Sequence, residues 1–315
     1  MFYTVAFLSL QREGSRAGEF SYFCRVCDVK IMRLSTEVAP GRSKFSFSYS
    51  DCITVLGSCF ADNIGSKLLG AGFDACVNPF GTLYNPLSLL SSVLRLESGE
   101  AFSGSDCEPM GAGAGLVCSF SHHTSFARPT AEEFLEVANE KLSEAAEFFS
   151  RSELVLITLG TAWVFEHGGK VVSNCLKRDA REFTRRRLSV GECTAALSDI
   201  VTRFPRKKFI FTLSPIRHLK DGAHGNQLSK AALLLALDEL LSAFPDRTEY
   251  FPAYEIVLDE LRDYRFYADD MCHPSSLAVD ILWERFLSFA LDSSQKEELL
   301  TREKLFRRSQ HRPLH

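Results

Sequence analysis

Short apolar runs alternate with longer segments of helical periodicity along most of the chain. Five short runs of mostly apolar residues predict strands at residues 53–57, 74–77, 154–159, 208–213 and 248–251. Apolar residues recur with a helical period at residues 87–97, 132–149, 190–204, 227–244 and 255–261. Repeated strand–helix units require a parallel sheet covered on both faces. We therefore predict an α/β fold, a three-layer sandwich around a central, mostly parallel sheet of about five strands.

The pattern divides the chain into one large domain and flanking segments. We assign residues 32–291 to a single α/β domain, interrupted near residues 98–129 by a Gly- and Ser-rich insertion whose His122 and His123 are expected to face solvent. Residues 292–315 predict a polar C-terminal helix or tail. Residues 1–31 are apolar at their start but lack a basic region and a cleavage site. We interpret them as a disordered extension or a start-site artefact, with Met32 as the natural start.

Composition fits a globular enzyme and argues against several partners. The chain has 315 residues, 45% of them hydrophobic and 24% charged, which suits one large domain. A net charge of −4 gives no electrostatic case for binding nucleic acid, and no apolar run is long enough for membrane insertion. Ten cysteines scattered through apolar runs indicate buried thiols of a reducing compartment, and hence a cytoplasmic protein. Cys24 and Cys27 form a CxxC unit without a second pair, so we predict no metal site.

The first candidate for chemistry is a hydroxyl at a strand-to-helix turn. Ser58 follows the run at residues 53–57, and residues 61–69 have helical spacing. A helix N-terminus offers free N–H groups that can hold a developing oxyanion. The same geometry also produces an ordinary N-cap serine, which the segment alone does not exclude.

The second candidate is an imidazole with a carboxylate three residues before it. Asp270 and His273 lie in a polar stretch just before a predicted helix, where the carboxylate can orient the ring. Asp269 is a rival for the same role, and a surface histidine with acidic neighbours is the alternative. Together with Ser58, these residues are the separated parts of a Ser-His-Asp triad.

Several motifs resemble a known family. The string at residues 57–61 resembles the signature of the GSCFA family, which is similar to the SGNH, or GDSL-like, hydrolases. Further matches span about residues 32–291, and they include residues 159–163, Asn174-Cys175, residues 214–218, Ser229-Lys230 and residues 264–267 leading into Asp270 and His273. The resemblance implies an SGNH-like fold without a metal or organic cofactor. It aligns Ser58 with the nucleophile of those hydrolases, and because a fold does not determine its chemistry, the activity must be argued from the site.

One departure from the SGNH pattern concerns the oxyanion hole. Ala162 occupies the place expected for the Asn of a Gly-x-Asn unit. We expect Ser58 and Gly81 to donate backbone N–H groups instead, with Asn174, Asn78 or Asn85 as substitutes for the missing amide. Each of these residues also suits an ordinary turn.

A thiol beside Ser58 provides a different nucleophile. Cys59 would be activated at a helix N-terminus, but only one of the two neighbours can face His273. The resemblance favours Ser58, and Cys59 is then a small packing residue. For substrate binding we select Gly160, Thr161, Trp163, Arg217 and His218, which follow the third and fourth predicted strands.

These residues predict an SGNH-type esterase or acyltransferase acting on a small-molecule ester, such as a carbohydrate O-acyl group. The alternatives are a non-catalytic ligand-binding or scaffolding protein on the same fold and a cysteine-dependent enzyme using Cys59. The sequence leaves the oligomeric state, the acceptor and the choice between hydrolysis and transfer open.

Overall fold

The computed structural model describes residues 35–113 and 115–310. The segment predicted as an N-terminal extension, residues 1–31, lies outside the described residues, and so do Cys24 and Cys27. From Glu37 onward the described residues form one compact unit.

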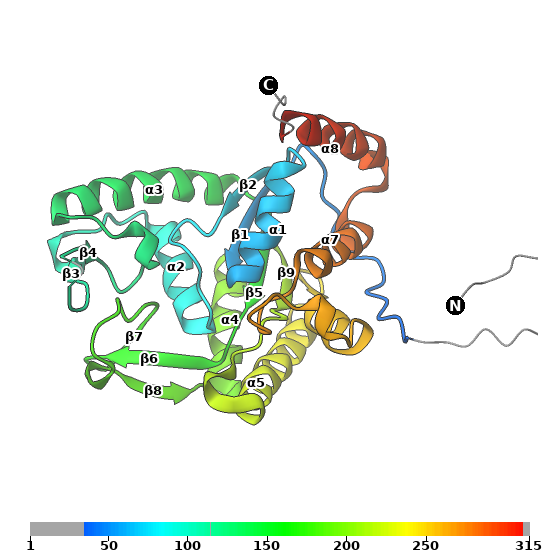
Figure 1. Cartoon of the computed structure of the whole chain (residues 1–315). Helices are drawn as coiled ribbons and strands as arrows, with labels where there is room; N and C mark the ends of the chain where they lie inside the picture. The colour runs from blue at the N-terminus through cyan, green and yellow to red at the C-terminus, as the bar shows by residue number, and fades with distance from the viewer. Residues whose placement is uncertain (1–34, 114, 311–315) are drawn as a thin grey trace, which may run out of the picture. The chain divides into compact units, whose positions relative to one another are not determined.

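The core of this unit is a five-stranded sheet in which every pair of neighbours is parallel (Figure 1). The strands are β1 (Cys52–Gly57), β2 (Asp74–Val77), β5 (Leu154–Leu159), β9 (Lys208–Leu213) and β10 (Thr248–Phe251). Their order across the sheet is β10-β9-β5-β1-β2. The predicted α/β sandwich is therefore confirmed, with five parallel strands.

Side chains alternate between two hydrophobic clusters, one on each face of this sheet. Val155 and Ile157 of β5 belong to one cluster, and Leu154 and Leu156 belong to the other. A strand that is buried on both faces reads as a continuous apolar run, which is why these strands were recognisable in the sequence.

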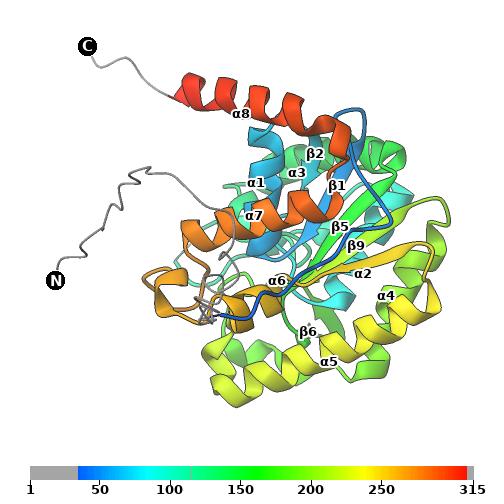
Figure 2. The same ribbon diagram turned by 90° about the vertical axis from the view of Figure 1, so that its right-hand side faces the viewer.

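Helices cover both faces of the sheet. Figure 2 shows α1 and α7 on one side of the strands and α4 and α5 on the other. The helices are α1 (Cys59–Gly70), α2 (Pro86–Ser98), α3 (Ala131–Arg151), α4 (Val190–Arg203), α5 (Gly222–Ala243), α6 (Ala253–Glu255), α7 (Ser276–Ala290) and α8 (Lys296–Gln310). The helix predicted at residues 255–261 is wrong in form, because α6 is a single turn followed by a π-helical turn, η5 (Ile256–Glu260).

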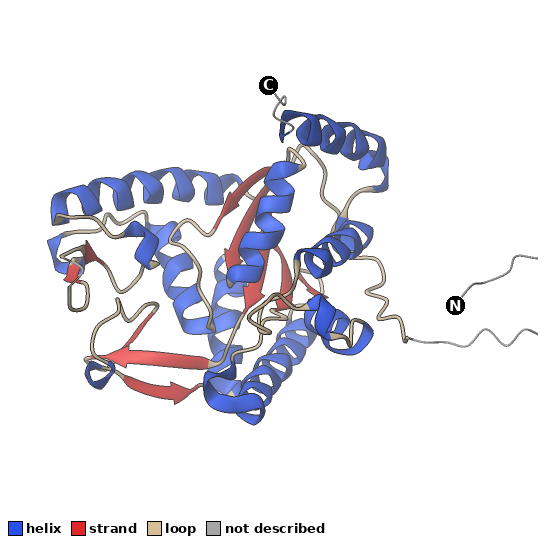
Figure 3. Cartoon of the chain, viewed as in Figure 1, coloured by secondary structure: helices blue, strands red, loops and turns tan. Residues whose placement is uncertain are grey.

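Two smaller sheets were not predicted. Strands β6 (Trp163–His167), β7 (Lys170–Val172) and β8 (Thr184–Arg187) form an antiparallel sheet that follows β5 in the chain, separate from the main sheet in Figure 3. Strands β3 (Glu108–Pro109) and β4 (Val117–Cys118) form a short hairpin. Single 3₁₀ turns complete the structure: η1 (Gly104–Asp106), η2 (Thr124–Phe126), η3 (Ala180–Glu182), η4 (Leu219–Asp221), η6 (Tyr264–Phe266) and η7 (Ser293–Gln295).

His122 corrects the expectation that both insertion histidines face solvent. Its side chain is fully buried, with Phe102 and Phe126 each within 5 Å between ring centroids. Its Nδ1 lies 2.6 Å from Ser119 Oγ. Burial lowers the pKa of His122 to about 4, so the ring is neutral at pH 7.

The order of the strands fixes the place of a ligand site. The chain runs from β1 outward to β2 and then returns to the other side of β1 with β5, so the connections diverge between β1 and β5. In open parallel sheets, ligands bind beyond the carboxyl ends of the strands at such a divergence.

Candidate functional site

The turn after β1 is held in one conformation by glycine and asparagine. Gly57 has φ of +139°, and a Cβ atom there would lie 2.2 Å from the carbonyl oxygen of Thr158 in β5. Its N–H donates to Asn78 Oδ1 at 2.8 Å, and Asn78 Nδ2 donates to Asp62 Oδ1 at 2.6 Å. Only glycine fits this close approach, and the asparagine fixes the start of α1 against the end of β2.

Ser58 caps helix α1 and lies away from any open space. Its side chain is fully buried, and its Oγ accepts the N–H of Phe60 at 3.3 Å. Its own N–H donates to Thr158 O at 3.2 Å. The Ser58 hydroxyl thus serves as an N-cap, and the Ser58 N–H, which was expected in the oxyanion hole, is already engaged.

Cys59 is the residue of this turn that reaches open space. It is the first residue of α1, it is partly exposed, and it lines a cavity beyond the carboxyl ends of the strands. Its Sγ lies 3.4 Å from Tyr84 Oη, and Thr82 Oγ1 lies 3.0 Å from the same phenol oxygen. Burial raises the pKa of Tyr84 to about 12, so the phenol keeps its proton at neutral pH.

The carboxylate and imidazole predicted before α7 form a pair. His273 Nδ1 lies 2.5 Å from Asp270 Oδ2, while Asp270 Oδ1 accepts the N–H groups of His273 and Cys272, each at 2.9 Å. These backbone N–H groups, together with the ring, hold the pKa of Asp270 down to about 2. Asp270 is therefore ionised at neutral pH and orients the ring, which leaves Nε2 to serve a reacting group.

Arg217 attaches the loop that carries this pair to the loop after β9. Its N–H donates to Cys272 O at 3.1 Å, and its Nη2 donates to Met271 O. Its guanidinium lies 4.3 Å from the centroid of the Tyr267 ring. The position of His273 therefore depends on the end of β9.

A cavity of about 590 Å³ brings these parts together. Cys59, Asp270 and His273 all line it. So do four of the five residues selected for substrate binding, Thr161, Trp163, Arg217 and His218, and two of the suggested amide donors, Asn85 and Asn174. Ser58, Gly81 and Gly160 do not line it. The thiol, and not the neighbouring hydroxyl, therefore shares this space with the histidine.

The expected oxyanion donors differ in what they can offer. The N–H of Gly81 donates to Asn78 O at 2.7 Å, which corrects the expectation that it is free. Asn174 lines the cavity, its Oδ1 accepts the N–H of Leu176, and its Nδ2 is the donor it can offer to an oxyanion. Ala162 is buried, and its N–H donates to Ser229 Oγ. No amide side chain therefore stands at the usual SGNH position.

A buried lysine connects the ends of two central strands. Lys230 Nζ donates to Gly160 O at 2.8 Å and to Ser214 O at 2.6 Å, and thereby joins the ends of β5 and β9. Burial lowers the pKa of Lys230 to about 7. Gly160 therefore contributes a carbonyl to the scaffold and no surface to the cavity.

His218 is a second, neutral imidazole on the cavity wall. Burial lowers its pKa to about 4, and the positive charges of Lys230 and His273 act in the same direction. Its ring packs edge-on against Tyr84, with 6.0 Å between centroids. His218 can therefore donate or accept one hydrogen bond, but it carries no charge at pH 7.

Sequence reasoning missed Tyr84 and Arg185. Tyr84 comes from the loop between β2 and α2. Arg185 comes from β8, and its guanidinium lies 4.3 Å from the centroid of the Trp163 ring. A tyrosine in a loop and an arginine in a run of three carry no signal of their own in the sequence.

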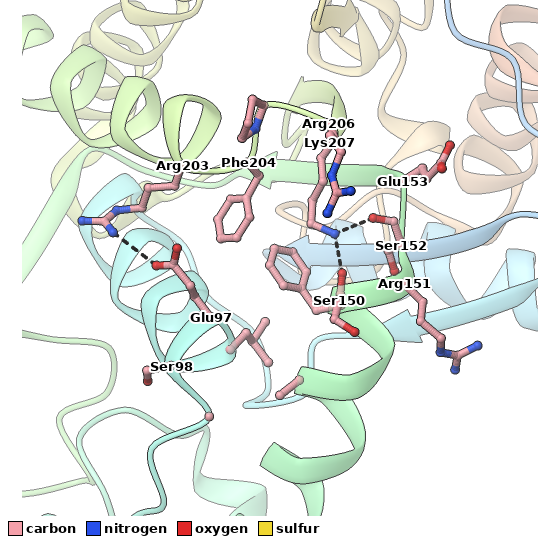
Figure 4. A pocket seen from close by; sticks show the side chains of 15 residues that line it. Glu97, Ser98, Ser150, Arg151, Ser152, Glu153, Arg203, Phe204, Arg206 and Lys207 are labelled. Carbon is pink, nitrogen blue, oxygen red and sulfur yellow. Dashed lines mark hydrogen bonds and ion pairs between the residues drawn. The ribbon is translucent and has the colours of Figure 1, made fainter.

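A second cavity of similar size, about 620 Å³, lies at the amino ends of β5 and β9 (Figure 4). Figure 4 shows Lys207 pointing toward the backbone at Ser152 and Arg203 paired with Glu97. Lys207 Nζ donates to Phe149 O and Ser152 O. The charges of Lys207 and Arg203 thus have protein partners, and no described residue that lines this cavity has a buried side-chain N or O atom without a hydrogen bond.

Within the part of the chain that the structure describes, no three His, Cys, Asp or Glu side chains gather as metal ligands would. Over the same residues, no helix combines the length and the apolar character needed to cross a membrane.

Comparison with solved structures gives distant similarities. One is a carbohydrate esterase family 2 enzyme with a carbohydrate-binding domain from Corynascus thermopiles (Myceliophthora fergusii), at 17% identity and a TM-score of 0.37, over 80% of this chain and 66% of that chain. Another is an acetyl xylan esterase from the rumen bacterium Butyrivibrio proteoclasticus, at 12% identity and a TM-score of 0.37, over 80% of this chain and 65% of that chain. The chain thus spans slightly less than two thirds of each of these proteins.

Among curated proteins, none matches the chain. The model of the GSCFA family matches residues 52–286, which run from the first residue of β1 into α7 and include Cys59, Tyr84 and His273. The chain therefore belongs to the GSCFA family.

Proposed function

We propose that the cavity at the carboxyl ends of the strands is the active site of an acyl-transferring enzyme in which Cys59 is the nucleophile. The observation that carries this proposal is that Cys59, His273 and Asp270 line one cavity while Ser58 is a buried cap. The expected substrate is a small acyl ester, with a carbohydrate O-acyl ester as one example. Hydrolysis and transfer differ only in whether water or another hydroxyl accepts the acyl group.

The chemistry follows from the roles that the residues can take. His273 Nε2 accepts the proton of the Cys59 thiol, and the thiolate attacks the ester carbonyl to form a tetrahedral intermediate. The C–O bond to the alcohol then breaks, and His273 returns the proton to the departing oxygen. Water or an acceptor hydroxyl, deprotonated by His273, attacks the resulting thioester and frees the cysteine. Asp270 keeps the imidazole in the required tautomer throughout.

Two donors near Cys59 can stabilise the intermediate. The N–H of Cys59 is the first in α1 and, as in any helix, has no carbonyl four residues before it within the helix. Tyr84 Oη, which lies 3.4 Å from Sγ, can take over the role of the missing amide at Ala162. Removing one such donor in other enzymes lowers kcat by about 100- to 1,000-fold.

The competing proposals each have an observation in their favour. A non-catalytic binding protein is favoured by Ala162, which offers no side-chain donor. A serine enzyme is favoured by the position of Ser58 beside the same turn, and it would require the turn to reorient so that the hydroxyl enters the cavity.

Acyl trapping separates these proposals. The purified protein is incubated with p-nitrophenyl acetate, quenched in acid, and digested to locate the acetyl group by peptide mass spectrometry. A fluorophosphonate probe, which selects activated serines, is used in parallel. Cys59→Ala, Ser58→Ala and His273→Ala are compared, with circular dichroism and urea unfolding as tests of folding.

We expect acetylation on Cys59 that requires His273, and no fluorophosphonate adduct on Ser58. Ser58→Ala should retain acyl transfer while losing about 1 kcal/mol of stability, as is typical for a lost N-cap. A His273-dependent adduct on Ser58 would show that the hydroxyl is the nucleophile. If neither residue is modified in folded protein, the chain is a binding protein.

A further inference from the structure

Buried donors without protein partners gather around the cavity. Among the described residues, six buried side-chain N or O atoms have no hydrogen-bond partner, and four of them belong to residues that line it: Trp163 Nε1, Arg185 Nε, Arg217 Nε and His218 Nε2. The Trp and Arg nitrogens can only donate. Because buried polar groups are nearly always paired, such a concentration indicates a ligand rich in acceptors.

The cavity also holds positive charge that no protein carboxylate neutralises. Arg185 is paired with Asp221, whose Oδ2 lies 2.7 Å from Nη2. In contrast, Arg217 and Lys220 form no ion pair with any described residue. Asp270, the remaining carboxylate of the cavity, is bound to His273. The two cations therefore favour a ligand with negative charge.

Two aromatic rings line the cavity next to the loop after β9. Trp163 and Phe165 come from β6, and the guanidinium of Arg185 lies 4.3 Å and 5.3 Å from their ring centroids. Lys220 Nζ lies 5.3 Å from the Phe165 ring. Cys59 lines the same cavity, so a ligand bound here shares that space with the thiol.

We propose that the cavity binds an oxyanionic group of the substrate, a carboxylate or a phosphate, at Arg217 and Lys220. The substrate class is thus an acyl ester whose acyl or alcohol part carries such a group. This inference rests on the proposed function, since it names the substrate of the same site.

Alkylation of Cys59 tests the inference without a known substrate. Iodoacetate and iodoacetamide transfer their CH₂ carbon to the same sulfur and release iodide, and they differ in that only iodoacetate carries a carboxylate. The second-order rates at Cys59 are measured at pH 7 by peptide mass spectrometry, which separates Cys59 from Cys175 and Cys272 in the same cavity. A synthetic peptide of residues 54–61 gives the reference ratio of the two rates.

We expect the ratio of iodoacetate to iodoacetamide rates to exceed that of the peptide by about fivefold, as for a unit charge near a cation at a partly buried site. Arg217→Gln and Lys220→Gln should each reduce the ratio. Arg206→Gln, at the other cavity, is the matched control and should leave it unchanged. A substitution that changes the reactivity of the thiol itself changes both rates by the same factor, so it leaves the ratio of the two rates unchanged.

Competition by simple anions identifies the bound group. Succinate and inorganic phosphate are added separately during alkylation by iodoacetamide, and slower modification that is lost in Arg217→Gln supports the inference. Whichever anion protects shows whether carboxylate or phosphate is preferred. Protection by neither anion would overturn the inference, and so would a ratio equal to that of the peptide.

These outcomes differ from failure of the proposed function. Suppose that iodoacetamide modifies Cys59 and the His273-dependent acetylation occurs, but the ratio equals that of the peptide. The proposed function is then supported and the proposed anion site is contradicted. If neither reagent modifies Cys59 in folded protein, the proposed function itself is contradicted.

Discussion

Two of the cavities among the described residues lie at opposite ends of the same strands and are nearly equal in volume, about 590 Å³ and 620 Å³. At the amino ends, Arg203 is bound to Glu97, and Lys207 is bound to two backbone carbonyls. At the carboxyl ends, four buried side-chain nitrogens have no hydrogen-bond partner, whereas no described residue that lines the cavity at the amino ends has such an atom. A thiol and a histidine–carboxylate pair line the same cavity at the carboxyl ends. Volume therefore does not distinguish a site from a gap between helices, whereas unmatched polar groups do.

The largest expected difference in activity between the two cavities comes from removing His273, the proposed base at the carboxyl ends of the strands. His273→Ala should lower kcat/KM for p-nitrophenyl acetate by about 100- to 10,000-fold, because no group would then take the proton of Cys59. Asp270→Asn should lower it less, since the imidazole remains. Steady-state hydrolysis, measured beside urea unfolding, checks both expectations.

The matched control is Lys207→Met at the amino end. It should leave kcat/KM unchanged while lowering the free energy of unfolding by about 1–3 kcal/mol, because two carbonyls lose their donor. An equal loss of activity in Lys207→Met and His273→Ala, with both folded, would abolish the distinction between the cavities.

Acid should weaken the fold through its neutral histidines. The pKa of His218 is about 4 in the folded protein, below the ordinary value of 6.5, and that of His122 is similar. The unfolded chain therefore binds protons first, so this stability is present above pH 6.5 and is lost as the pH falls toward 4, by about 3 kcal/mol for each histidine. Urea unfolding at pH 7, 5.5 and 4.5 measures the loss.

His218→Asn separates the two contributions to the pH dependence of stability, that of His218 in the cavity and that of His122 in the core. The variant should retain only the part of the pH dependence that comes from His122. Identical slopes for the variant and the parent protein would mean that His218 is charged or solvated in the folded state, contrary to its buried position.

A smaller effect is expected at the phenol beside the thiol. Tyr84→Phe should lower kcat for acyl transfer by about 10- to 100-fold with little change in KM, because the hydroxyl acts on the intermediate and hardly on the bound ester. Thr82→Val should have a weaker effect in the same direction, since Thr82 acts through its hydrogen bond to the phenol oxygen. An unchanged kcat in Tyr84→Phe would limit the donors to the backbone.

The strands of the main sheet could be predicted from the sequence because parallel strands buried on both faces consist of continuous apolar residues. β5 and β9 begin and end at the predicted residues. The small sheet was not predictable in this way, since β8 reads Thr-Arg-Arg-Arg and β6 contains a mixture of aromatic and charged residues. Its strands are defined by their partners and not by a pattern of their own.

The candidate site was predictable where its geometry is local. Asp270 and His273 are three residues apart, and the structure pairs them within one turn. The choice between Ser58 and Cys59 depends on which of two successive side chains caps the helix, and sequence spacing does not encode that direction. The free N–H expected at Gly81 was wrong because a turn to Asn78 uses it.

In the proposed anion site, Arg217 would link substrate preference to reaction rate. The same guanidinium that faces the cavity also donates to Met271 O in the loop of His273. A lineage that exchanged this arginine to accept a neutral substrate would also remove a hydrogen bond that holds the loop of His273 in place. New specificities in this architecture should therefore evolve by first rebuilding the support of the histidine loop, and only then by changing residue 217.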